Sequence, residues 1–285
     1  MLNFPDCRGS IVADYALESI LAVLDQAPQQ EWLWVLSTGD VAELPDSNVP
    51  LKWLADVAGS SAPLSDVVVT DPAAAMQMLF TSGTTGDPKA IIASYARFDA
   101  VSSIGPLIGL TQEDRLYSGL SLTHANAQLI TLGNALKMGL PCVISRKFTK
   151  SRLWDICRAY GCTFFNLLGG MTTAIYAEPP RADDADNPVR LILSAGMPAA
   201  IWEDFAQRFG VRLFEFYGAA EGGLTFNPTG IGPVGSCGKA PPSMLLDILD
   251  EDGNECRPGQ SGEICFREAD GSCQQLNYFK TPEAT

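Results

Sequence analysis

The sequence predicts an α/β fold: mostly parallel sheets flanked by helices, followed by a small antiparallel β unit. From residue 76 onward, short apolar runs alternate with amphipathic segments, and this order favours parallel pairing through right-handed crossovers. The runs are apolar throughout, which is typical of strands covered by helices on both faces. After residue 222, glycine and proline become dense and short strands follow, which indicates the antiparallel unit.

The same patterns place individual elements. We expect strands at 32–36, 76–80, 140–145, 162–167, 189–194, 211–217, 245–249 and 263–267. We expect helices at 15–24, 94–108 and 126–138, after 149, from about 170 and from 198. Thr149 is placed to cap its helix, and Pro198 stands where a first-turn proline is welcome. Residues 37–75 carry four prolines and scattered acids, so they are interpreted as connecting segments.

Composition excludes several classes of protein. With 285 residues, a net charge of −14 and 46% hydrophobic residues, the chain forms a core and is a poor candidate for nucleic-acid binding. Residues 81–175 nevertheless carry nine bases and five acids, a local charge of +4. A basic middle suits a small phosphate-bearing ligand, although charge alone favours the alternative of a solvated helix face.

The eight cysteines form no C-x-x-C pair, and His124 is the only histidine, so a zinc site is not expected. The sequence shows no signal peptide, and no apolar run approaches the ~18 residues of a membrane helix. We therefore expect no transmembrane segment, reduced cysteines and a cytoplasmic location.

The strongest chemical signal is the string LFTSGTTGDPK at residues 79–89. Glycines let a backbone approach an anion and point N–H groups at it, hydroxyls add donors, and Lys89 adds a charge. The string differs from a Walker loop, because proline precedes the lysine and alanine follows it. The predicted phosphate cradle consists of Thr81, Ser82, Gly83, Thr84, Thr85, Gly86 and Lys89.

This string resembles the phosphate-loop signature of the adenylate-forming superfamily, [YF]-T-S-G-T-T-G-x-P-K-G, with Ala90 as the only departure. Further resemblances follow in the family's order. They are the acyl-pocket loop at 122–128, the adenine turn at 194–198, the Y-G-x-T-E motif at 215–221, and the G-E-[LI] and G-Y-x-x-x-P-x-x-T segments at 262–264 and 277–285. Ala220 replaces the threonine of Y-G-x-T-E, and Asn277 replaces the glycine before Tyr278.

The resemblance assigns roles to residues. Tyr217 offers a flat face to a purine, and the small residues of the turn at 194–198 lie on the purine's other side. Glu221 holds Mg²⁺ against phosphates, and His124 lines or gates the acyl pocket. Lys89, His124 and Glu221 are thus the catalytic candidates. Besides the cradle, the candidate cofactor-binding residues are Ala195, Gly196, Met197, Glu215, Phe216, Tyr217, Gly218 and Ala220. Taken singly, each residue favours a plainer interpretation: Tyr217 an ordinary core residue, Glu221 a surface carboxylate and His124 a structural histidine.

The implied reaction has two steps. A carboxylate attacks the α-phosphate of ATP to give acyl-AMP and pyrophosphate, and coenzyme A then displaces AMP; Mg²⁺ assists the first step. The resemblance is nearest to fatty-acid or carnitine-type CoA ligases. An adenylation domain that loads a carrier protein and a non-catalytic nucleotide-binding remnant stay open, as do the identity of the acid and the oligomeric state.

The resemblance also implies a domain plan: a partial N-terminal α/β segment at 1–75, a nucleotide-binding core at 76–222, and part of a small β-barrel subdomain at 223–285. Family members have a longer N-terminal lobe and a C-terminal lobe with the adenylating lysine. We expect this chain to be truncated at both ends, without the C-terminal lobe, and inactive or partial in isolation. Ser37–Asp40 matches the letters of the ribose-binding motif but lies before the phosphate loop, so we interpret the match as coincidence.

Overall fold

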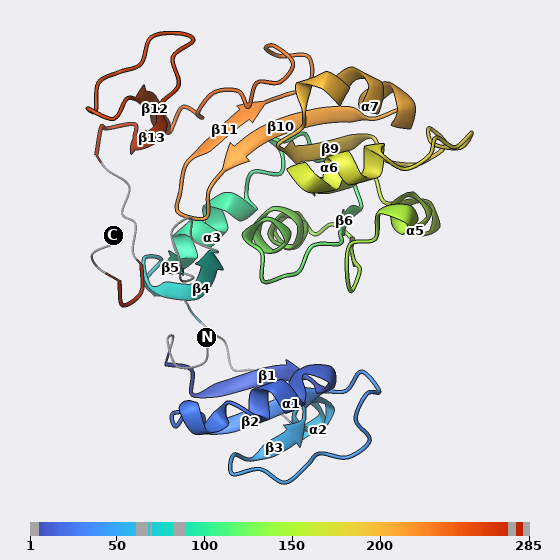
Figure 1. The fold of residues 1–285 in the computed structure, drawn as a ribbon, viewed down its shortest axis with the longest axis vertical. Helices are drawn as coiled ribbons and strands as arrows, with labels where there is room; N and C mark the ends of the chain where they lie inside the picture. Colours follow the sequence, from blue (N-terminus) through green and yellow to red (C-terminus); the bar gives the residue numbers. More distant parts are fainter. Residues whose placement is uncertain (1–5, 61–67, 69, 82–88, 273–277, 282–285) are drawn as a thin grey trace. The chain divides into compact units, whose positions relative to one another are not determined.

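The computed structural model of the chain describes residues 6–60, 68, 70–81, 89–272 and 278–281 (Figure 1). These residues form two compact units. One unit holds the described part of 1–71 together with 279–281, and the other holds the described part of 72–278. Among the described helices, none combines the length and hydropathy needed to cross a lipid bilayer. The described cysteines all carry free thiols.

The first unit is a three-stranded parallel sheet in the order β1 (Gly9–Ala13), β2 (Trp32–Leu36), β3 (Leu51–Trp53). The predicted strand at 32–36 is confirmed. The expected helix at 15–24 is divided into a 3-10 turn, the short helix α1 (Leu17–Leu21) and a second 3-10 turn. The prediction of connecting segments at 37–75 is wrong in part, because β3 and α2 (Leu54–Ser60) lie there.

A buried carboxylate organises the loop after β2. Asp14 accepts the backbone N–H groups of Thr38, Gly39 and Asp40 at 2.8, 3.1 and 3.1 Å, and it also accepts the Thr38 hydroxyl. Burial alone would raise the pKa of Asp14, but these hydrogen bonds outweigh it and hold the pKa well below its usual range. The donors of this loop are therefore satisfied inside the first unit.

The second unit contains a six-stranded sheet in the order β11-β10-β9-β8-β6-β7. The strands are β6 (Leu116–Ser118), β7 (Cys142–Ile144), β8 (Phe164–Leu168), β9 (Leu191–Ala195), β10 (Arg212–Gly218) and β11 (Leu224–Asn227). All neighbours pair in parallel except β11, which runs antiparallel to β10. The α/β prediction is confirmed, although the short strands β6 and β11 were not expected.

The inner strands of this sheet are buried on both faces, whereas the edge strand β7 is partly exposed. Along β8, Phe165 faces a core shared with α5 (Leu153–Tyr160), α6 (Gly169–Tyr176) and α7 (Trp202–Phe209). Its neighbour Phe164 faces the opposite core, shared with α4 (Asn134–Met138) and the π-helical segment Asn126–Gly133 before it. Consecutive strand residues point to opposite faces, so the two cores lie on opposite sides of the sheet.

The helices agree with their predicted positions and differ in their ends. The helix expected at 126–138 is π-helical in its first part, and Thr149 makes no side-chain capping hydrogen bond. The helix expected from Pro198 begins as a 3-10 turn at Ala199 before α7. The predicted apolar face of α7 is confirmed, because Phe205 and Phe209 are fully buried.

The main difference in topology concerns residues 75–94. β4 (Ala75–Thr81) and β5 (Lys89–Ser94) form an antiparallel hairpin of their own, where the alternating pattern favoured parallel pairing and predicted only the first strand. Seven residues separate the strands, and a parallel crossover needs a dozen or more. Ser94 then caps α3 (Tyr95–Ser102), because its hydroxyl accepts the backbone N–H of Arg97 at 3.2 Å.

The antiparallel unit expected after residue 222 is present as the pair β12 (Met244–Leu249) and β13 (Glu263–Glu268). The ring of Phe266 from β13 packs where a Cβ on Gly223 would lie, and Gly223 has φ +78°. A side chain at residue 223 is excluded by both the space and the backbone angle. This contact joins the hairpin to the turn that precedes β11.

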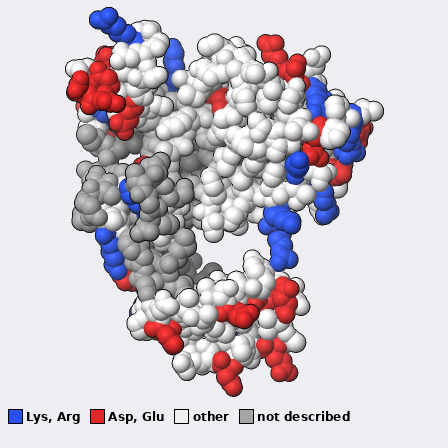
Figure 2. Space-filling model, viewed as in Figure 1, with Lys and Arg blue, Asp and Glu red and all other residues white. Residues whose placement is uncertain are grey.

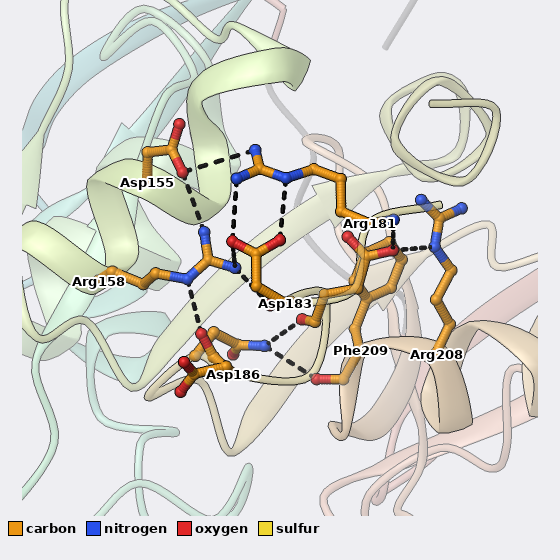
Figure 3. Close-up of polar contacts among 9 residues, drawn as sticks. Asp155, Arg158, Arg181, Asp183, Asp186, Arg208 and Phe209 are labelled. Atoms are coloured by element: carbon orange, nitrogen blue, oxygen red, sulfur yellow. Dashed lines mark hydrogen bonds and ion pairs between the residues drawn. The ribbon is translucent and has the colours of Figure 1, made fainter. Parts of the chain in front are cut away.

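Charged side chains fix the connection between α6 and β9 (Figure 3). Arg158 and Arg181 share Asp183, and Arg158 also pairs with Asp155 at 2.9 Å. Arg208 of α7 reaches the buried Asp184 in the same connection at 2.7 Å. Figure 2 shows positive and negative side chains intermixed at this part of the surface. These contacts hold a segment that has no regular secondary structure.

The amino-terminal edge of the sheet depends on another buried carboxylate. Asp114, which precedes β6, accepts hydrogen bonds from the hydroxyl of Thr163 at 2.6 Å and from Nε of Arg190 at 2.8 Å. Thr163 precedes β8 and Arg190 precedes β9, so one side chain connects the starts of three neighbouring strands. The hydrogen bonds from Arg190 and Thr163 outweigh burial and lower the pKa of Asp114 from 3.8 to about 2.

We expect Asp114→Ala to lower the free energy of unfolding by about 2–4 kcal/mol, because Thr163 and Arg190 lose a buried acceptor. The wild-type contribution is complete above pH ~4, the unfolded pKa, and is lost as pH falls through about 2. Urea unfolding at several pH values measures both effects. Asp99→Ala, at an exposed carboxylate paired with Lys137, is the control and should cost less than about 1 kcal/mol. An equal cost for the two variants would contradict this role.

Candidate functional site

The topology brings the candidate residues to one edge of the large sheet. β6, β8, β9 and β10 are parallel neighbours, so the loops that follow them leave from the same carboxyl edge. These loops carry His124, the turn at 195–197 and the segment 218–221. Within the sheet, β7 lies on one side of β6, whereas β8, β9 and β10 follow one another on its other side. In open α/β sheets, ligands bind at such a reversal of strand order.

The turn after β9 is held by a buried carboxylate. Glu215 of β10 accepts the backbone N–H of Gly196 at 2.6 Å and that of Met197 at 3.1 Å. Gly196 has φ +96°, and a Cβ there would lie 3.3 Å from the Cα of Gly169 after β8. Burial raises the pKa of Glu215, and the two N–H groups oppose this shift. The Glu215 carboxylate thus fixes the shape of the predicted adenine turn.

The predicted purine platform lies at the end of β10. Tyr217 is 37% exposed, and its ring is parallel to that of Phe266, with centroids 6.2 Å apart. The neighbouring Phe216 points into the sheet's core, so its side chain serves packing. Gly218 ends the strand opposite Leu224, and Ala220 follows in the turn. The parts of these residues in nucleotide binding stay predictions.

The phosphate cradle is described only at its ends. Ser82, Gly83, Thr84, Thr85 and Gly86 lie outside the described residues. Thr81 and Lys89 pair in register across the β4–β5 hairpin.

Lys89 and Glu221 meet on one tyrosine. The Lys89 ammonium lies 5.3 Å from the ring centroid of Tyr278, and the Tyr278 hydroxyl donates to Oε1 of Glu221 at 3.2 Å. Arg97 donates to the backbone carbonyls of Glu221, at 3.2 Å, and of Ala220. The structure thus brings together the predicted phosphate-loop lysine and the predicted metal carboxylate.

His124 lies at the start of the π-helical segment. Its Nδ1 accepts the backbone N–H of Asn126 at 3.1 Å, which leaves Nε2 to carry the proton of the neutral ring. Burial lowers the pKa of His124 from 6.5. π-Helical turns occur frequently at functional sites. The role of His124 beside an acyl pocket stays a prediction.

Two contact residues of this site were missed by sequence analysis. Arg97 lies on α3, in a stretch whose only visible pattern was helical. Tyr278 belongs to a segment matched to the family, but nothing in its spacing pointed to Lys89 or Glu221. Neither contact has a local signal, because both depend on tertiary packing of distant segments.

Some of the basic residues at 81–175 lie at the candidate ligand site, and others form ion pairs at the surface. Lys137, Lys150 and Arg158 are engaged in ion pairs with acids. Lys89 and Arg97 contact the candidate site. The solvated-surface interpretation therefore accounts for part of the basic stretch, and two cations lie at the predicted ligand site.

The fold and site define an α/β protein whose candidate ligand-binding loops gather at the carboxyl edge of a parallel sheet. The chain belongs to the AMP-binding enzyme family, whose model matches residues 7–272. The resemblance predicted from the sequence is confirmed.

Two relatives agree with this assignment, and a solved structure shares the fold. The chain is 32% identical over 242 residues to long-chain fatty acid transport protein 6 of Mus musculus, covering 84% of this chain and 38% of that protein. It is 35% identical over 196 residues to the medium/long-chain-fatty-acid–CoA ligase FadD17 of Mycobacterium marinum, covering 68% of this chain and 38% of the ligase. The anthranilate CoA ligase AuaEII shares the fold, with a TM-score of 0.84 and 21% identity over 98% of this chain and 54% of that structure.

We expect Glu215→Ala to expose the amides of Gly196 and Met197 to hydrogen exchange. Their protection should fall about tenfold or more, because hydrogen bonds to a charged acceptor contribute about 1.5–3 kcal/mol. Glu215→Gln keeps one oxygen acceptor and should give an intermediate result. The amide of Ile192, in the middle of β9, is the internal control and should change less. Unchanged protection at Gly196 in Glu215→Ala would contradict the role of this carboxylate.

The pKa of His124 should lie below 6.5. Protonation of Nδ1 removes the acceptor of the Asn126 N–H, so the start of the π-helical segment should loosen as pH falls through that pKa. Because the chain has one histidine, a single imidazole NMR signal reports the titration, and the Asn126 amide signal should move with it. A midpoint above 6.5, or an Asn126 amide that does not respond, would contradict this account.

Proposed function

We propose that this chain carries the ATP site of an AMP-forming carboxylic acid–CoA ligase. The observation that supports this most is the meeting of Lys89 and Glu221 on Tyr278. It places a cation and a carboxylate together at the end of the phosphate-loop hairpin, as binding of a metal–nucleotide complex requires.

The proposed chemistry has two steps. A carboxylate oxygen of the acid attacks the α-phosphorus of ATP, and the bond to the pyrophosphate oxygen breaks to give acyl-AMP. The thiolate of coenzyme A then attacks the acyl carbon, and AMP leaves with the electron pair. Neither step uses a protein nucleophile. Lys89 would face the phosphates, and Tyr217 with the turn at 195–197 would hold the purine.

The donor set at Glu221 suits Mg²⁺. In nucleotide sites Mg²⁺ usually binds one or two carboxylates, substrate phosphates and water. Oε2 of Glu221 makes no hydrogen bond within the described residues, and no cluster of three or more His, Cys, Asp or Glu residues is found there. Glu221 would hold the ion mainly against the nucleotide, where the ion neutralises phosphate charge.

We infer the substrate class from the relatives. Both relatives named above are described by long-chain or medium/long-chain fatty acids, and the bacterial relative is described as a CoA ligase. A fatty acid and free coenzyme A are therefore the proposed substrates, and a cytoplasmic location is proposed with them. The chain spans 38% of the length of each of these relatives, so the complete reaction is a proposal.

We expect Lys89→Ala and Glu221→Ala each to weaken Mg·ATP binding by about tenfold, the effect of losing one charged contact. Calorimetric titration of this chain with ATP in Mg²⁺ measures the affinity. Lys137→Ala is the matched control, because that ammonium pairs with Asp99 at the surface and should leave binding unchanged. Unaltered affinity in the Lys89 or Glu221 variant would contradict the role of that residue.

A turnover assay separates the remaining alternatives. The chain is supplied with ATP, Mg²⁺, coenzyme A and a panel of fatty and aromatic acids, and acyl-CoA and pyrophosphate are measured. Acyl-CoA formation supports the ligase. Pyrophosphate release without thioester formation favours a carrier-protein acceptor, and ATP binding without any reaction favours a nucleotide-binding remnant or the need for a further lobe.

A further inference from the structure

Tyr278 is fixed next to the phosphate-loop hairpin by its backbone. It forms an antiparallel bridge with Ile91 of β5, two residues after Lys89, and only 8% of its surface is exposed. A buried tyrosine normally finds a partner for its hydroxyl. Here the partner is the carboxylate of Glu221, which lies on the turn between β10 and β11. Tyr278 therefore joins three segments that are distant in the sequence.

The two charges occupy different parts of this side chain. Lys89 lies over the ring, where a cation is attracted by π-electrons, and Glu221 accepts from the hydroxyl. Lys89 and Glu221 do not form an ion pair with each other, although both side chains are described. A direct contact would neutralise both charges. Because each charge contacts a different part of Tyr278, the ammonium can still meet a phosphate and the carboxylate can still meet a cation.

The position of Glu221 is also restrained through its backbone. Arg97 donates to the carbonyls of Ala220 and Glu221, so the peptide that carries the side chain is held by α3. The phenol holds Oε1, and Oε2 makes no other hydrogen bond among the described residues. A carboxylate oxygen can only accept, so the Tyr278 hydroxyl is the donor in this pair. One carboxylate oxygen is thus oriented while the other is left for a ligand.

We propose that Tyr278 is a positioning residue of the ATP site, which aims the Glu221 carboxylate at the metal and keeps Lys89 from pairing with it. This inference rests on the proposed function. It goes beyond that function by assigning a role to Tyr278, which acts through Glu221 and Lys89, and by predicting that the role concerns the metal-dependent part of ATP binding.

The test compares ATP affinity in Mg²⁺ with affinity in EDTA. Tyr278→Phe keeps the ring beneath Lys89 and removes the hydroxyl. The quantity compared is the ratio of ATP affinity in Mg²⁺ to ATP affinity in EDTA. We expect this ratio to be about three- to tenfold smaller in Tyr278→Phe than in the wild-type chain, while the affinity in EDTA changes less than twofold. Tyr278→Leu also removes the ring, so its affinity in EDTA should fall a further two- to fivefold. In a Glu221→Gln background, Tyr278→Phe should have no further effect on this ratio.

Tyr176 provides a matched control. Its hydroxyl donates to the carboxylate of Asp204 at 3.3 Å, and the guanidinium of Arg208 lies 5.9 Å from its ring centroid. Tyr176 thus also combines a phenol, a carboxylate and a cation, here a guanidinium, but these groups lie on α6 and α7. Tyr176→Phe should leave ATP affinity unchanged in both conditions. Circular dichroism and the melting temperature of each variant check that the fold is retained.

The outcomes distinguish this inference from the proposed function. If the wild-type chain does not bind ATP, or binds it equally with and without Mg²⁺, the proposed function fails and this role fails with it. If the wild-type chain shows Mg²⁺-dependent binding and Tyr278→Phe behaves like it, only the role of Tyr278 is overturned. Equal weakening in Mg²⁺ and EDTA, or additivity with Glu221→Gln, also overturns the role, because either shows a merely structural effect.

Discussion

Burial of the parallel strands on both faces is the constraint on which the candidate site depends. Strands such as β8, with Phe164 on one core and Phe165 on the other, are mostly apolar, and the polar Asn166 of β8 is paired inside the core with Asn126 and Thr131. Side chains that can meet a ligand are then found mainly at the ends of the strands. Because the strands are parallel, their carboxyl ends lie at one edge, and loops from distant parts of the sequence meet there.

The two edges of the sheet use buried carboxylates in different ways. Asp114, at the amino edge, meets a guanidinium and a hydroxyl, and its pKa is lowered to about 2. Glu215, at the carboxyl edge, meets only uncharged donors, and burial raises its pKa. Asp114 connects the strand starts, and the charge of its carboxylate is balanced by the guanidinium of Arg190. Glu215 shapes a turn with backbone N–H groups and brings no cation to the place where we propose that a purine binds.

Sequence patterns predicted the parts of the fold that have a local cause. The apolar face of α7 and the strand at 32–36 follow from residue periodicity, and both are confirmed. β6 has three residues, too few to show any period, and β3 lies in a proline-rich stretch whose pairing with β2 is a tertiary effect. The β4–β5 hairpin was missed because we extended the alternation of strands and helices to a segment whose connection is too short for a parallel crossover.

The candidate site shows the same division between local and tertiary causes. Lys89 and Glu221 stand in recognisable strings, but the strings do not show that one tyrosine contacts both. The two cations at the site also differ in a way that only the contacts reveal. Arg97 is held by two carbonyls of the 220–221 turn, so its guanidinium has a structural task. Lys89 has an aromatic face as its contact, and such a contact contributes only about 0.5–1 kcal/mol at an exposed site. A phosphate can therefore draw the ammonium away at small cost, whereas moving Arg97 would release the turn that carries Glu221.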